Sequence, residues 1–473
     1  MFKKILIANR GEIAIRIIRA CNDLGIESVA IHSRADRDSL HVKMSNEAYE
    51  VSDDPLRAYL DPVKIVDIAK QCKAEAIHPG YGFLSENTDF AKIVEQSKLV
   101  FIGPKAEVIK KMGDKNAARA LMKENGIPIV PGTDVINHLH NDEIIRLAHK
   151  IGFPVVIKAS SGGGGRGIRV VWSESKLLDS IQSCKREALA FFKNDDVFLE
   201  KYVVKPKHIE FQILADNYGK IIHLGERDCS IQRRHQKLIE IAPSPTISED
   251  LRRKMGVVAV AAARAAGYTN AGTVEFLVDD FNNFFFMEMN TRIQVEHGVT
   301  EEVTGYDLIA RQIRIASGEI LELEQSDIKI SGFSIEARIN AEDVTKDFAP
   351  TPGKITGYYP ALGPGVRVDS CAYKDYTIPP YYDSMIAKLI IKSANYDLAV
   401  KKLNRALNEF KVRGVKTTIP FLINIANDRD FRKGIFDTSY LEEKLSSLIP
   451  QEQEIPEDIA AAIVAALACR YEQ

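Results

Sequence analysis

The sequence predicts an α/β protein that begins with a doubly wound parallel sheet and continues into an α+β unit. Three observations carry this prediction. Short apolar runs alternate with helix-period segments over about 1–113, which is typical of a parallel sheet covered by helices. A glycine run at 162–165 lies between two strand-like segments. From about 204 to 448 the chain is rich in strand-like sequence interrupted by Pro/Gly turns.

Composition limits the classes of protein that this chain can represent. It has 473 residues, 63 Lys+Arg against 65 Asp+Glu and a formal net charge of -2, which excludes a broadly basic nucleic-acid coat. The sequence contains no apolar run long enough for a transmembrane helix and no signal-peptide pattern at the N-terminus. The six cysteines are scattered without a CxxC pair, so neither a disulfide framework nor a zinc site is expected. A cytoplasmic enzyme without membrane or nucleic-acid partners is therefore predicted.

The first domain is predicted at 1–113. Residues 5–8, 28–31, 76–78 and 99–103 have the character of buried strands, and a helix that contains Ile13, Ile17 and Cys21 follows the first of them. The second domain, 114–203, contains two helical patterns, a strand-like run ending at Ala159, the glycine-rich stretch, a second strand at 168–172 and a third at 197–202.

The glycine-rich stretch is SSGGGGRG at 160–167. Its GxGxxG spacing does not indicate a dinucleotide fold, because a strand follows it where that fold needs a helix. A glycine loop between two strands is instead a flap whose bare N–H groups fold over phosphates, with Lys158 as a phosphate partner. No GxxxxGK[ST] sequence occurs, which excludes a Walker-type site. The simpler alternative is an irregular loop without function.

Two stretches of the third domain, 204–448, carry candidate chemistry. Residues 273–278 and 284–290 flank a turn, and the hairpin register that places Asp280 opposite Asn283 places Val278 opposite Phe285 and Glu275 opposite Glu288. Two opposed carboxylates destabilise a ladder unless a cation lies between them. Together with Asn290 they form an oxygen ligand set that selects Mg²⁺ or Mn²⁺. The alternative is a solvated hairpin face.

The segment that follows places charged or amide side chains at every second residue from 288 to 296, on one face of an extended chain. This face offers metal ligands, then Arg292 and Gln294, then the carboxylate of Glu296, enough to hold a metal phosphate, orient a small anion and supply a base. A surface strand of alternating charge is the alternative. Residues 227–237 hold five cationic or potentially cationic side chains and represent either a phosphate-binding stretch or a solvated basic loop.

The last segment, 449–473, begins with a Pro/Glu/Gln-rich linker and continues with Ile459, Ile463 and Leu467 at helical spacing. A short amphipathic helix is predicted. It either docks a partner or packs on the parent domain.

Together these motifs resemble the biotin carboxylases of the ATP-grasp superfamily. The resemblance runs from residue 1 to about 448 and rests on IANRGEIA at 7–14, HPGYGFLSEN at 78–87, the glycine flap, ERDCS at 226–230 and EMNTRIQVEH at 288–297. It implies that the glycine stretch belongs to an ATP-grasp lid and that the third domain combines the ATP-grasp core with a biotin carboxylase C-terminal domain.

The resemblance also implies site residues. Glu296 would be the general base, Arg338 would stabilise the biotin ureido oxygen, and Lys237 would approach the γ-phosphate or bicarbonate. Arg292, Gln294 and Val295 would bind bicarbonate, and Glu275, Glu288 and Asn290 would hold Mg²⁺ or Mn²⁺, with two ions expected. The remaining ATP contacts would come from Lys115, Lys158, Gly163, Gly164, Gly165, Glu200, Lys201, Val203, His208, Gln232 and His235.

The implied reaction is ATP- and bicarbonate-dependent carboxylation of biotin N1 through carboxyphosphate. The biotin would be carried by a partner, because no Met-Lys-Met carrier sequence occurs here, and a carboxyltransferase would complete the enzyme. A homodimer is expected. The acceptor, acetyl-CoA or pyruvate or another 2-oxoacid, stays open, with the tail slightly favouring a 2-oxoacid. The alternatives are an ATP-grasp carboxylate-amine ligase and a catalytically silent nucleotide-binding regulatory subunit.

Overall fold

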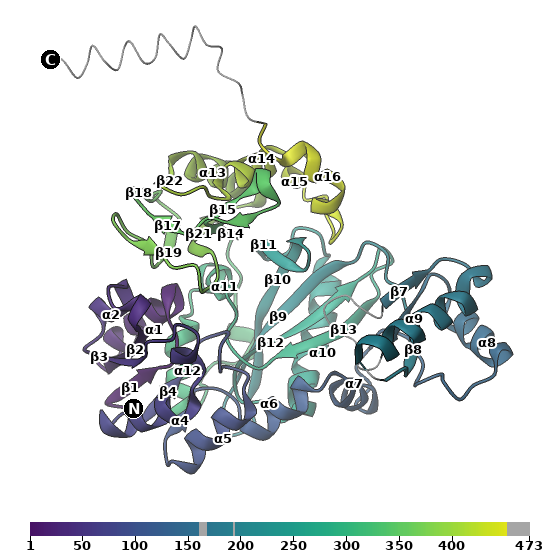
Figure 1. Cartoon of the computed structure of the whole chain (residues 1–473), viewed down its shortest axis with the longest axis horizontal. Coiled ribbons are helices and arrows are strands. Elements are labelled where there is room, and N and C mark those ends of the chain that lie inside the picture. The colour runs from purple at the N-terminus through teal and green to yellow at the C-terminus, as the bar shows by residue number, and fades with distance from the viewer. Residues whose placement is uncertain (160–167, 193, 452–473) are drawn as a thin grey trace, which may run out of the picture.

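The computed structural model describes residues 1–159, 168–192 and 194–451. Three groups of elements are visible in Figure 1, and the third of them forms the largest sheet. In this part of the chain no helix combines the length and the apolarity needed to cross a bilayer.

The N-terminal group is a five-stranded sheet of order β3-β2-β1-β4-β5 in which every pairing is parallel. The doubly wound sheet expected from the alternating pattern is thus confirmed. Its strands are β1 (Lys4–Ile7), β2 (Glu27–Ser33), β3 (Glu47–Ser52), β4 (Ala76–His78) and β5 (Val100–Phe101). Its helices are α1 (Gly11–Asp23), α2 (Leu40–Met44), α3 (Arg57–Leu60), α4 (Pro62–Gln71), α5 (Thr88–Gln96) and α6 (Ala106–Gly113).

The second group projects from the body of the molecule (Figure 1). It is a three-stranded antiparallel sheet of order β7-β6-β8, formed by β6 (Val155–Ala159), β7 (Ile168–Val171) and β8 (Val197–Lys201). The helices α8 (Asn141–Ile151) and α9 (Leu177–Phe192) cover it. The strand predicted after the glycine stretch is therefore present as β7. The preceding helix α7 (Lys115–Glu124) contributes Ala118 and Met122 to the core of the large sheet instead.

The third group is an eight-stranded antiparallel sheet of order β13-β12-β9-β10-β11-β14-β21-β19. Its strands are β9 (Lys207–Ala215), β10 (Ile221–Arg233), β11 (Gln236–Ala242), β12 (Asn270–Val278), β13 (Phe284–Asn290), β14 (Phe333–Asn340), β19 (Val366–Ser370) and β21 (Met385–Ser393). A helix from Ser248 to Gly267 is predicted from the sequence, with Ser as N-cap and Gly as stop. The structure has helix α10 (Glu249–Ala266) there, with the Ser248 hydroxyl accepting from the Leu251 N–H and left-handed Gly267 at its end.

The remaining elements pack around the C-terminal half of this sheet. The helices are α11 (His297–Thr304), α12 (Leu308–Ala316), α13 (Tyr396–Glu409), α14 (Ile419–Asn427), α15 (Arg429–Arg432) and α16 (Tyr440–Leu448). Three small ladders pair β15 (Glu342–Asp343) with β16 (Ala349–Pro350), β17 (Gly353–Lys354) with β20 (Thr377–Ile378) and β18 (Gly357–Tyr359) with β22 (Lys411–Arg413). The amphipathic helix predicted around Ile459 lies outside the described residues.

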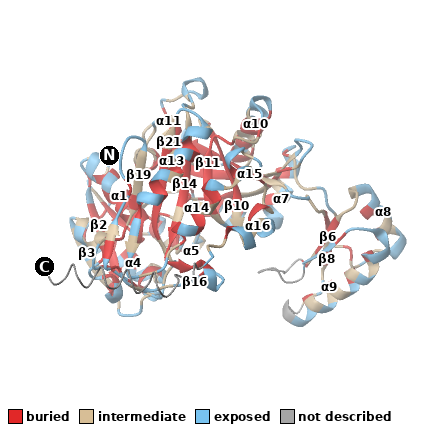
Figure 2. Cartoon of the chain, turned by 90° about the horizontal axis from the view of Figure 1, so that it is seen from above, coloured by how far each residue is buried: buried red, intermediate tan, exposed pale blue. Residues whose placement is uncertain are grey.

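Buried residues fill the body of the molecule, and a smaller buried group lies between the strands and helices of the projecting part (Figure 2). The large sheet differs from an ordinary apolar core, because charged side chains of β9, β10, β11 and β14 are fully buried within it. Buried charges need partners, and their arrangement defines the candidate active site.

Candidate active site

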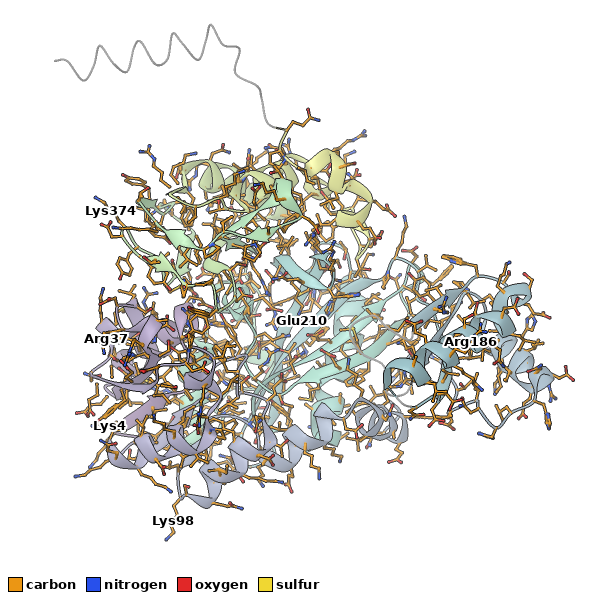
Figure 3. The ribbon with its side chains drawn as sticks, viewed as in Figure 1. Lys4, Arg37, Lys98, Arg186, Glu210 and Lys374 are labelled. Atoms are coloured by element: carbon orange, nitrogen blue, oxygen red, sulfur yellow. The ribbon has the colours of Figure 1, made fainter. Side chains whose placement is uncertain are left out.

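The site lies over the middle of the large sheet, where β9 to β12 face the segment 291–296 and the start of α11. Figure 3 shows Glu210 of β9 in the middle of the molecule, whereas the labelled cations Lys4, Arg37, Lys98 and Lys374 lie at its outline. The site side chains Glu210, Arg227, Glu275 and Glu296 are buried, which strengthens their interactions relative to those in water.

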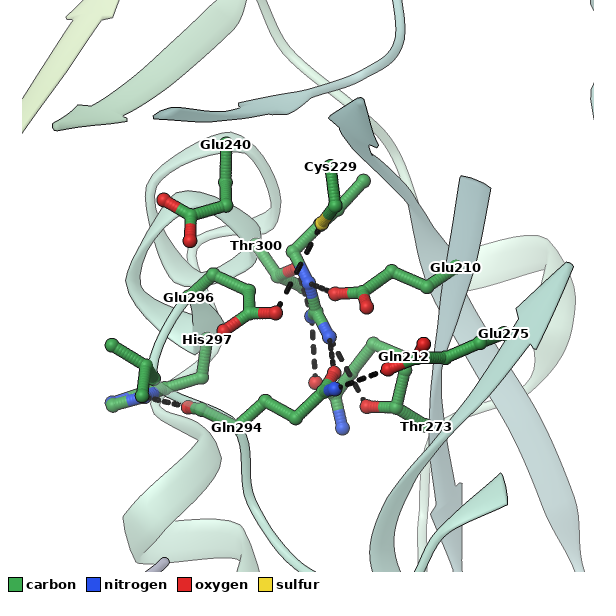
Figure 4. Close-up of polar contacts among 12 residues, drawn as sticks. Glu210, Gln212, Cys229, Glu240, Thr273, Glu275, Gln294, Glu296, His297 and Thr300 are labelled. Carbon is green, nitrogen blue, oxygen red and sulfur yellow. Dashed lines mark hydrogen bonds and ion pairs between the residues drawn. The ribbon is translucent and has the colours of Figure 1, made fainter. Parts of the chain in front are cut away.

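Arg227 of β10 is the organising cation. Its side chain is fully buried, and all five of its N–H donors are used. Figure 4 labels the residues that accept from it. Nε donates to Glu210 at 2.5 Å, and the terminal nitrogens donate to Gln212, Thr300, Thr273 and Gln294 at 2.8, 3.0, 3.1 and 2.8 Å. Arg227 therefore connects three strands with Gln294 of the segment 291–296 and Thr300 of α11.

Lys237 of β11 is the second cation of the site, and it joins three carboxylates; its side chain is 13% exposed. Its Nζ lies 2.7 Å from Glu210, 3.3 Å from Glu275 and 2.7 Å from Glu296. Burial alone would lower the pKa of Lys237, but these acids outweigh it and hold the pKa well above the usual value. The ammonium is consequently charged at neutral pH.

Glu296 lies between two cations. One carboxylate oxygen accepts from Lys237 and the other from Arg338 of β14 at 2.9 Å. Arg338 is itself held by Glu240, whose Oε1 accepts from Nε at 2.6 Å. Burial would raise the pKa of Glu296, but Lys237, Arg338 and Arg227 hold it well below its usual range. Burial and the nearby Glu296 raise the pKa of Glu240 to about 7.

Glu275 and Glu288 are cross-strand partners on β12 and β13, as the sequence predicts. Glu275 accepts from Asn290 and Gln294 at 2.7 Å each and from His208 at 2.7 Å. The predicted continuation of the register was wrong: Val278 pairs with Phe284 rather than Phe285, because a β-bulge follows Glu275.

The donor set fits a hard divalent cation. Burial and the facing Glu275 raise the pKa of Glu288, which is the conflict that a cation between two carboxylates removes. The side chain of Glu288 is 37% exposed, so one oxygen is accessible to a ligand. Mg²⁺ bound by Glu275, Glu288 and Asn290 would supply charge neutralisation at the phosphates.

The extended face predicted for 288–296 was wrong beyond Asn290, where β13 ends and the chain turns toward α11. Gln294 and Glu296 still join the carboxylate cluster, because Arg227 and Lys237 bind them. Arg292 lies at the edge of the cluster: it donates to Glu86 at 3.0 Å and to Asn290 at 3.2 Å.

The predicted nucleotide ligands fall into two groups. His208 joins the cluster through Glu275, Gln232 is half-buried opposite Lys237 in the β10–β11 ladder, and Lys115 lies 3.6 Å from Glu288. The other group lies at the projecting sheet. There Glu200 contacts Lys158 and Arg119, and the Lys201 ammonium donates to the Gly152 and Phe153 carbonyls at 2.8 and 2.9 Å.

Three further predictions have different outcomes. Val203 is half-buried beyond β8, and His235 is exposed in a left-handed turn between β10 and β11. Gly163, Gly164 and Gly165 lie outside the described residues.

Sequence reasoning missed Arg119, Glu210, Arg227 and Glu240 as parts of the site. It treated 227–237 as one basic stretch, whereas the structure divides it. Arg227 is buried and Lys237 partly buried, both facing the carboxylates, and Arg233 and Arg234 contact Asp347 at the surface. The available signal was charge inside otherwise apolar strands, as at Glu210 within 209–214 and Glu240 within 238–242.

A parallel N-terminal sheet, a small projecting sheet with a glycine-rich connection, and a carboxylate–lysine site on an antiparallel sheet together define an ATP-grasp enzyme. Three family models match: Biotin carboxylase, N-terminal domain at 1–109, Carbamoyl-phosphate synthase L chain, ATP binding domain at 114–324, and Biotin carboxylase C-terminal domain at 336–443.

The similar proteins agree with these models. The chain is 54% identical over 445 residues to Biotin carboxylase 1 of Bacillus subtilis, covering 93% of this chain and 98% of the relative. It is 52% identical over 468 residues to the 2-oxoglutarate carboxylase small subunit of Hydrogenobacter thermophilus, covering 99% of both. The crystal structure of the biotin carboxylase subunit of pyruvate carboxylase matches with a TM-score of 0.88 at 50% identity, covering 96% of this chain and 100% of that one.

The biotin carboxylase domain dimer of the Hydrogenobacter thermophilus 2-oxoglutarate carboxylase, solved with MgADP, ADP and bicarbonate, matches with a TM-score of 0.87 at 52% identity, covering 96% of this chain and 100% of that one. The chain therefore belongs to the biotin carboxylase family, and the family predicted from its motifs is confirmed.

Proposed function

We propose that this chain carboxylates the N1 of biotin on a carrier protein, with ATP and bicarbonate as co-substrates and carboxyphosphate as the intermediate. The observation that carries the proposal is the position of Glu296 between Lys237 and Arg338. A carboxylate flanked by two cations suits a reaction in which one anion loses a proton and attacks another anion, because each partner needs charge stabilisation.

The proposed sequence of events assigns each residue one task. Arg292, Gln294 and the Val295 N–H bind bicarbonate, and Glu296 takes its proton while the bicarbonate oxygen attacks the γ-phosphorus of ATP. ADP leaves, and carboxyphosphate breaks down to CO₂ and phosphate. The phosphate removes the N1 proton of biotin, Arg338 stabilises the ureido oxygen, and N1 attacks CO₂.

The contact between Lys237 and Glu296 adds one requirement to this reaction. Glu296 cannot accept a proton readily while Lys237 holds its pKa low. We propose that Lys237 turns from Glu296 toward the γ-phosphate when ATP binds, which raises the pKa of Glu296 at the moment a base is needed. Glu275, Glu288 and Asn290 would hold the Mg²⁺ that accompanies ATP, and Lys115, Lys158, Gly163, Gly164, Gly165, Glu200, Lys201, Val203, His208, Gln232 and His235 would contact the nucleotide.

The deciding experiment is ATP hydrolysis by the purified chain with Mg²⁺ and bicarbonate, with and without a high concentration of free biotin. The proposal expects hydrolysis that needs bicarbonate and rises with biotin, and expects Glu296→Gln to abolish it while ATP binding remains. Turnover that is indifferent to both compounds, or that needs a larger carboxylate, would favour a carboxylate-amine ligase. ATP binding without any turnover would favour a regulatory role.

The final acceptor is proposed to be a 2-oxoacid. Among relatives whose alignments cover 98% or more of this chain, the 2-oxoglutarate carboxylase small subunit is 52% identical and a pyruvate carboxylase subunit of Methanothermobacter thermautotrophicus 50%, against 49% for the chloroplastic biotin carboxylase of Arabidopsis thaliana. The holoenzyme purified through this chain, containing a biotin carrier and a carboxyltransferase, should carboxylate pyruvate or 2-oxoglutarate. Carboxylation of acetyl-CoA alone would contradict the proposal.

Three organisational features complete the proposal. The domains are proposed at 1–113, 114–203 and 204–448, with 449–473 as linker and helix. A homodimer is proposed, to be checked by light scattering. A cytoplasmic location is proposed because the five cysteines in the described part lie outside any disulfide, as suits a reducing compartment, and cell fractionation would test it.

A further inference from the structure

Lys388 of β21 is a buried cation to which the proposed reaction gives no task. Its side chain is fully buried. In the β14–β21 ladder it lies directly opposite Arg338. Burial alone would lower the pKa of Lys388, but Glu12, Glu336 and Asp369 outweigh burial and raise it, so the side chain is a charged ammonium. A buried ammonium must use its donors.

One of these donors reaches the segment proposed to bind bicarbonate. Lys388 Nζ donates to the Val295 carbonyl at 2.7 Å. That carbonyl and the N–H of Glu296 belong to one planar peptide unit, so the hydrogen bond fixes the plane that joins Val295 to Glu296. The Val295 N–H belongs to the preceding peptide unit, whose Gln294 carbonyl accepts from His297 at 2.8 Å. Among the described residues nothing accepts this N–H, which leaves it for a ligand.

Two motifs of the N-terminal part hold Lys388 in place. Glu12, from the motif at 7–14, lies 3.3 Å from Lys388 Nζ, and it accepts from the hydroxyl of Tyr81, from the motif at 78–87. Glu86 of the second motif accepts from the Thr291 N–H at 3.1 Å and from Arg292 at 3.0 Å. The N-terminal part thus anchors the segment 291–296 at both ends.

We propose that Lys388 is a positioning residue that fixes the peptide between Val295 and Glu296, and that the Glu12–Tyr81 contact holds Lys388 for this task. The proposal rests on the proposed bicarbonate site. The competing explanation is that Lys388 only neutralises the buried acids around it. The two explanations differ in the kinetics they expect. If Lys388 only neutralises acids, its loss should not lower kcat/KM for bicarbonate specifically.

The test compares Lys388→Met with Lys392→Met in bicarbonate-dependent ATP hydrolysis. Lys392 lies four residues further along β21, its side chain is only partly buried and it contacts none of the site. The proposal expects Lys388→Met to lower kcat/KM for bicarbonate about tenfold, the loss of one charge-assisted hydrogen bond, with KM for ATP unchanged. Lys392→Met is expected to match the parent protein.

Lys388→Met leaves several acids without their cation, so Glu12→Gln/Lys388→Met is prepared beside it, with Glu12→Gln alone as the reference for the double variant. Folding is checked by circular dichroism before the kinetics. Unchanged kcat/KM for bicarbonate in a folded variant lacking Lys388, or equal losses in the constants for ATP and bicarbonate, would overturn the positioning role. A parent protein without bicarbonate-dependent hydrolysis would instead overturn the proposed function.

Discussion

Replacing Arg227 by Met should destabilise the protein far more than replacing an exposed arginine. The substitution keeps an unbranched side chain of similar length but removes five hydrogen bonds, one of them in a fully buried ion pair with Glu210. Breaking one partner of a buried pair costs about 3–5 kcal/mol, and four neutral acceptors lose a donor as well. We expect a loss of about 5 kcal/mol in the free energy of unfolding.

The matched control is Arg253→Met on α10. The Arg253 side chain is 74% exposed and contacts Asp250 at 2.7 Å, and such surface pairs contribute less than about 1 kcal/mol. Urea unfolding should be followed by far-ultraviolet circular dichroism. The single tryptophan, Trp172, lies next to β7 in the projecting part and would report on the wrong sheet. Losses for Arg227→Met and Arg253→Met that agree within about 1 kcal/mol would refute the reasoning.

Three further predictions follow from the same kind of geometry. Glu240→Gln removes the charge that holds Arg338, so biotin carboxylation should slow about tenfold while bicarbonate-dependent hydrolysis without biotin changes less, as measured by phosphate release. Burial would raise the pKa of Asp36, but Arg10 lowers it to about 2. Because the pKa in the unfolded chain is higher, the Asp36–Arg10 pair stabilises the fold at neutral pH. The free energy of unfolding, measured with urea, should fall by about 2 kcal/mol as the pH falls from about 4 to about 2. Glu288→Gln removes the carboxylate whose pKa burial and Glu275 raise, so the metal-free protein should melt no lower while the rise in melting temperature on adding Mg²⁺ disappears.

Each of these has its own contradicting result. Equal slowing of both reactions in Glu240→Gln would mean that Glu240 does not act through Arg338. An Asp36→Asn variant as sensitive to acid as the parent would place the titrating group elsewhere. An undiminished Mg²⁺ effect in Glu288→Gln would move the cation away from the β12–β13 pair.

The fold was predictable where a local sequence pattern determines the backbone geometry directly. The parallel sheet followed from alternating apolar and helical segments, and helix α10 followed from Ser248 and Gly267 at its ends. The pairing of Glu275 with Glu288 followed from hairpin register. The bulge after Glu275 did not, because residues 276–278 and 284–287 are all apolar and show no alternation that an extra residue could shift.

The site was only partly predictable, because distant partners decide what a charged residue does. Arg227 and Arg233 are both arginines in one basic stretch, yet one is enclosed by acceptors from β9, β12 and α11 and the other contacts Asp347 at the surface. Nothing within 227–237 distinguishes them: they are six residues apart, so the two-residue alternation of a strand would place both on one face, and the register irregularities between Asp228 and Gln232 are not visible in the sequence. The roles of individual residues toward ATP and bicarbonate stay predictions.

The projecting sheet has a consequence for cooperativity. Every residue of its apolar core comes from 136–199, so the β6-β7-β8 layer and its two helices carry their own cohesion. Because this core is separate from that of the large sheet, displacing the part as a unit leaves the larger core intact. The backbone near Pro131 and Lys201 has to bend, and the contact between Arg119 of α7 and Glu200 of β8 has to break. Amide protons of β6 and β8 should therefore exchange with solvent as one group, at a rate independent of the strands that hold Arg227 and Glu296.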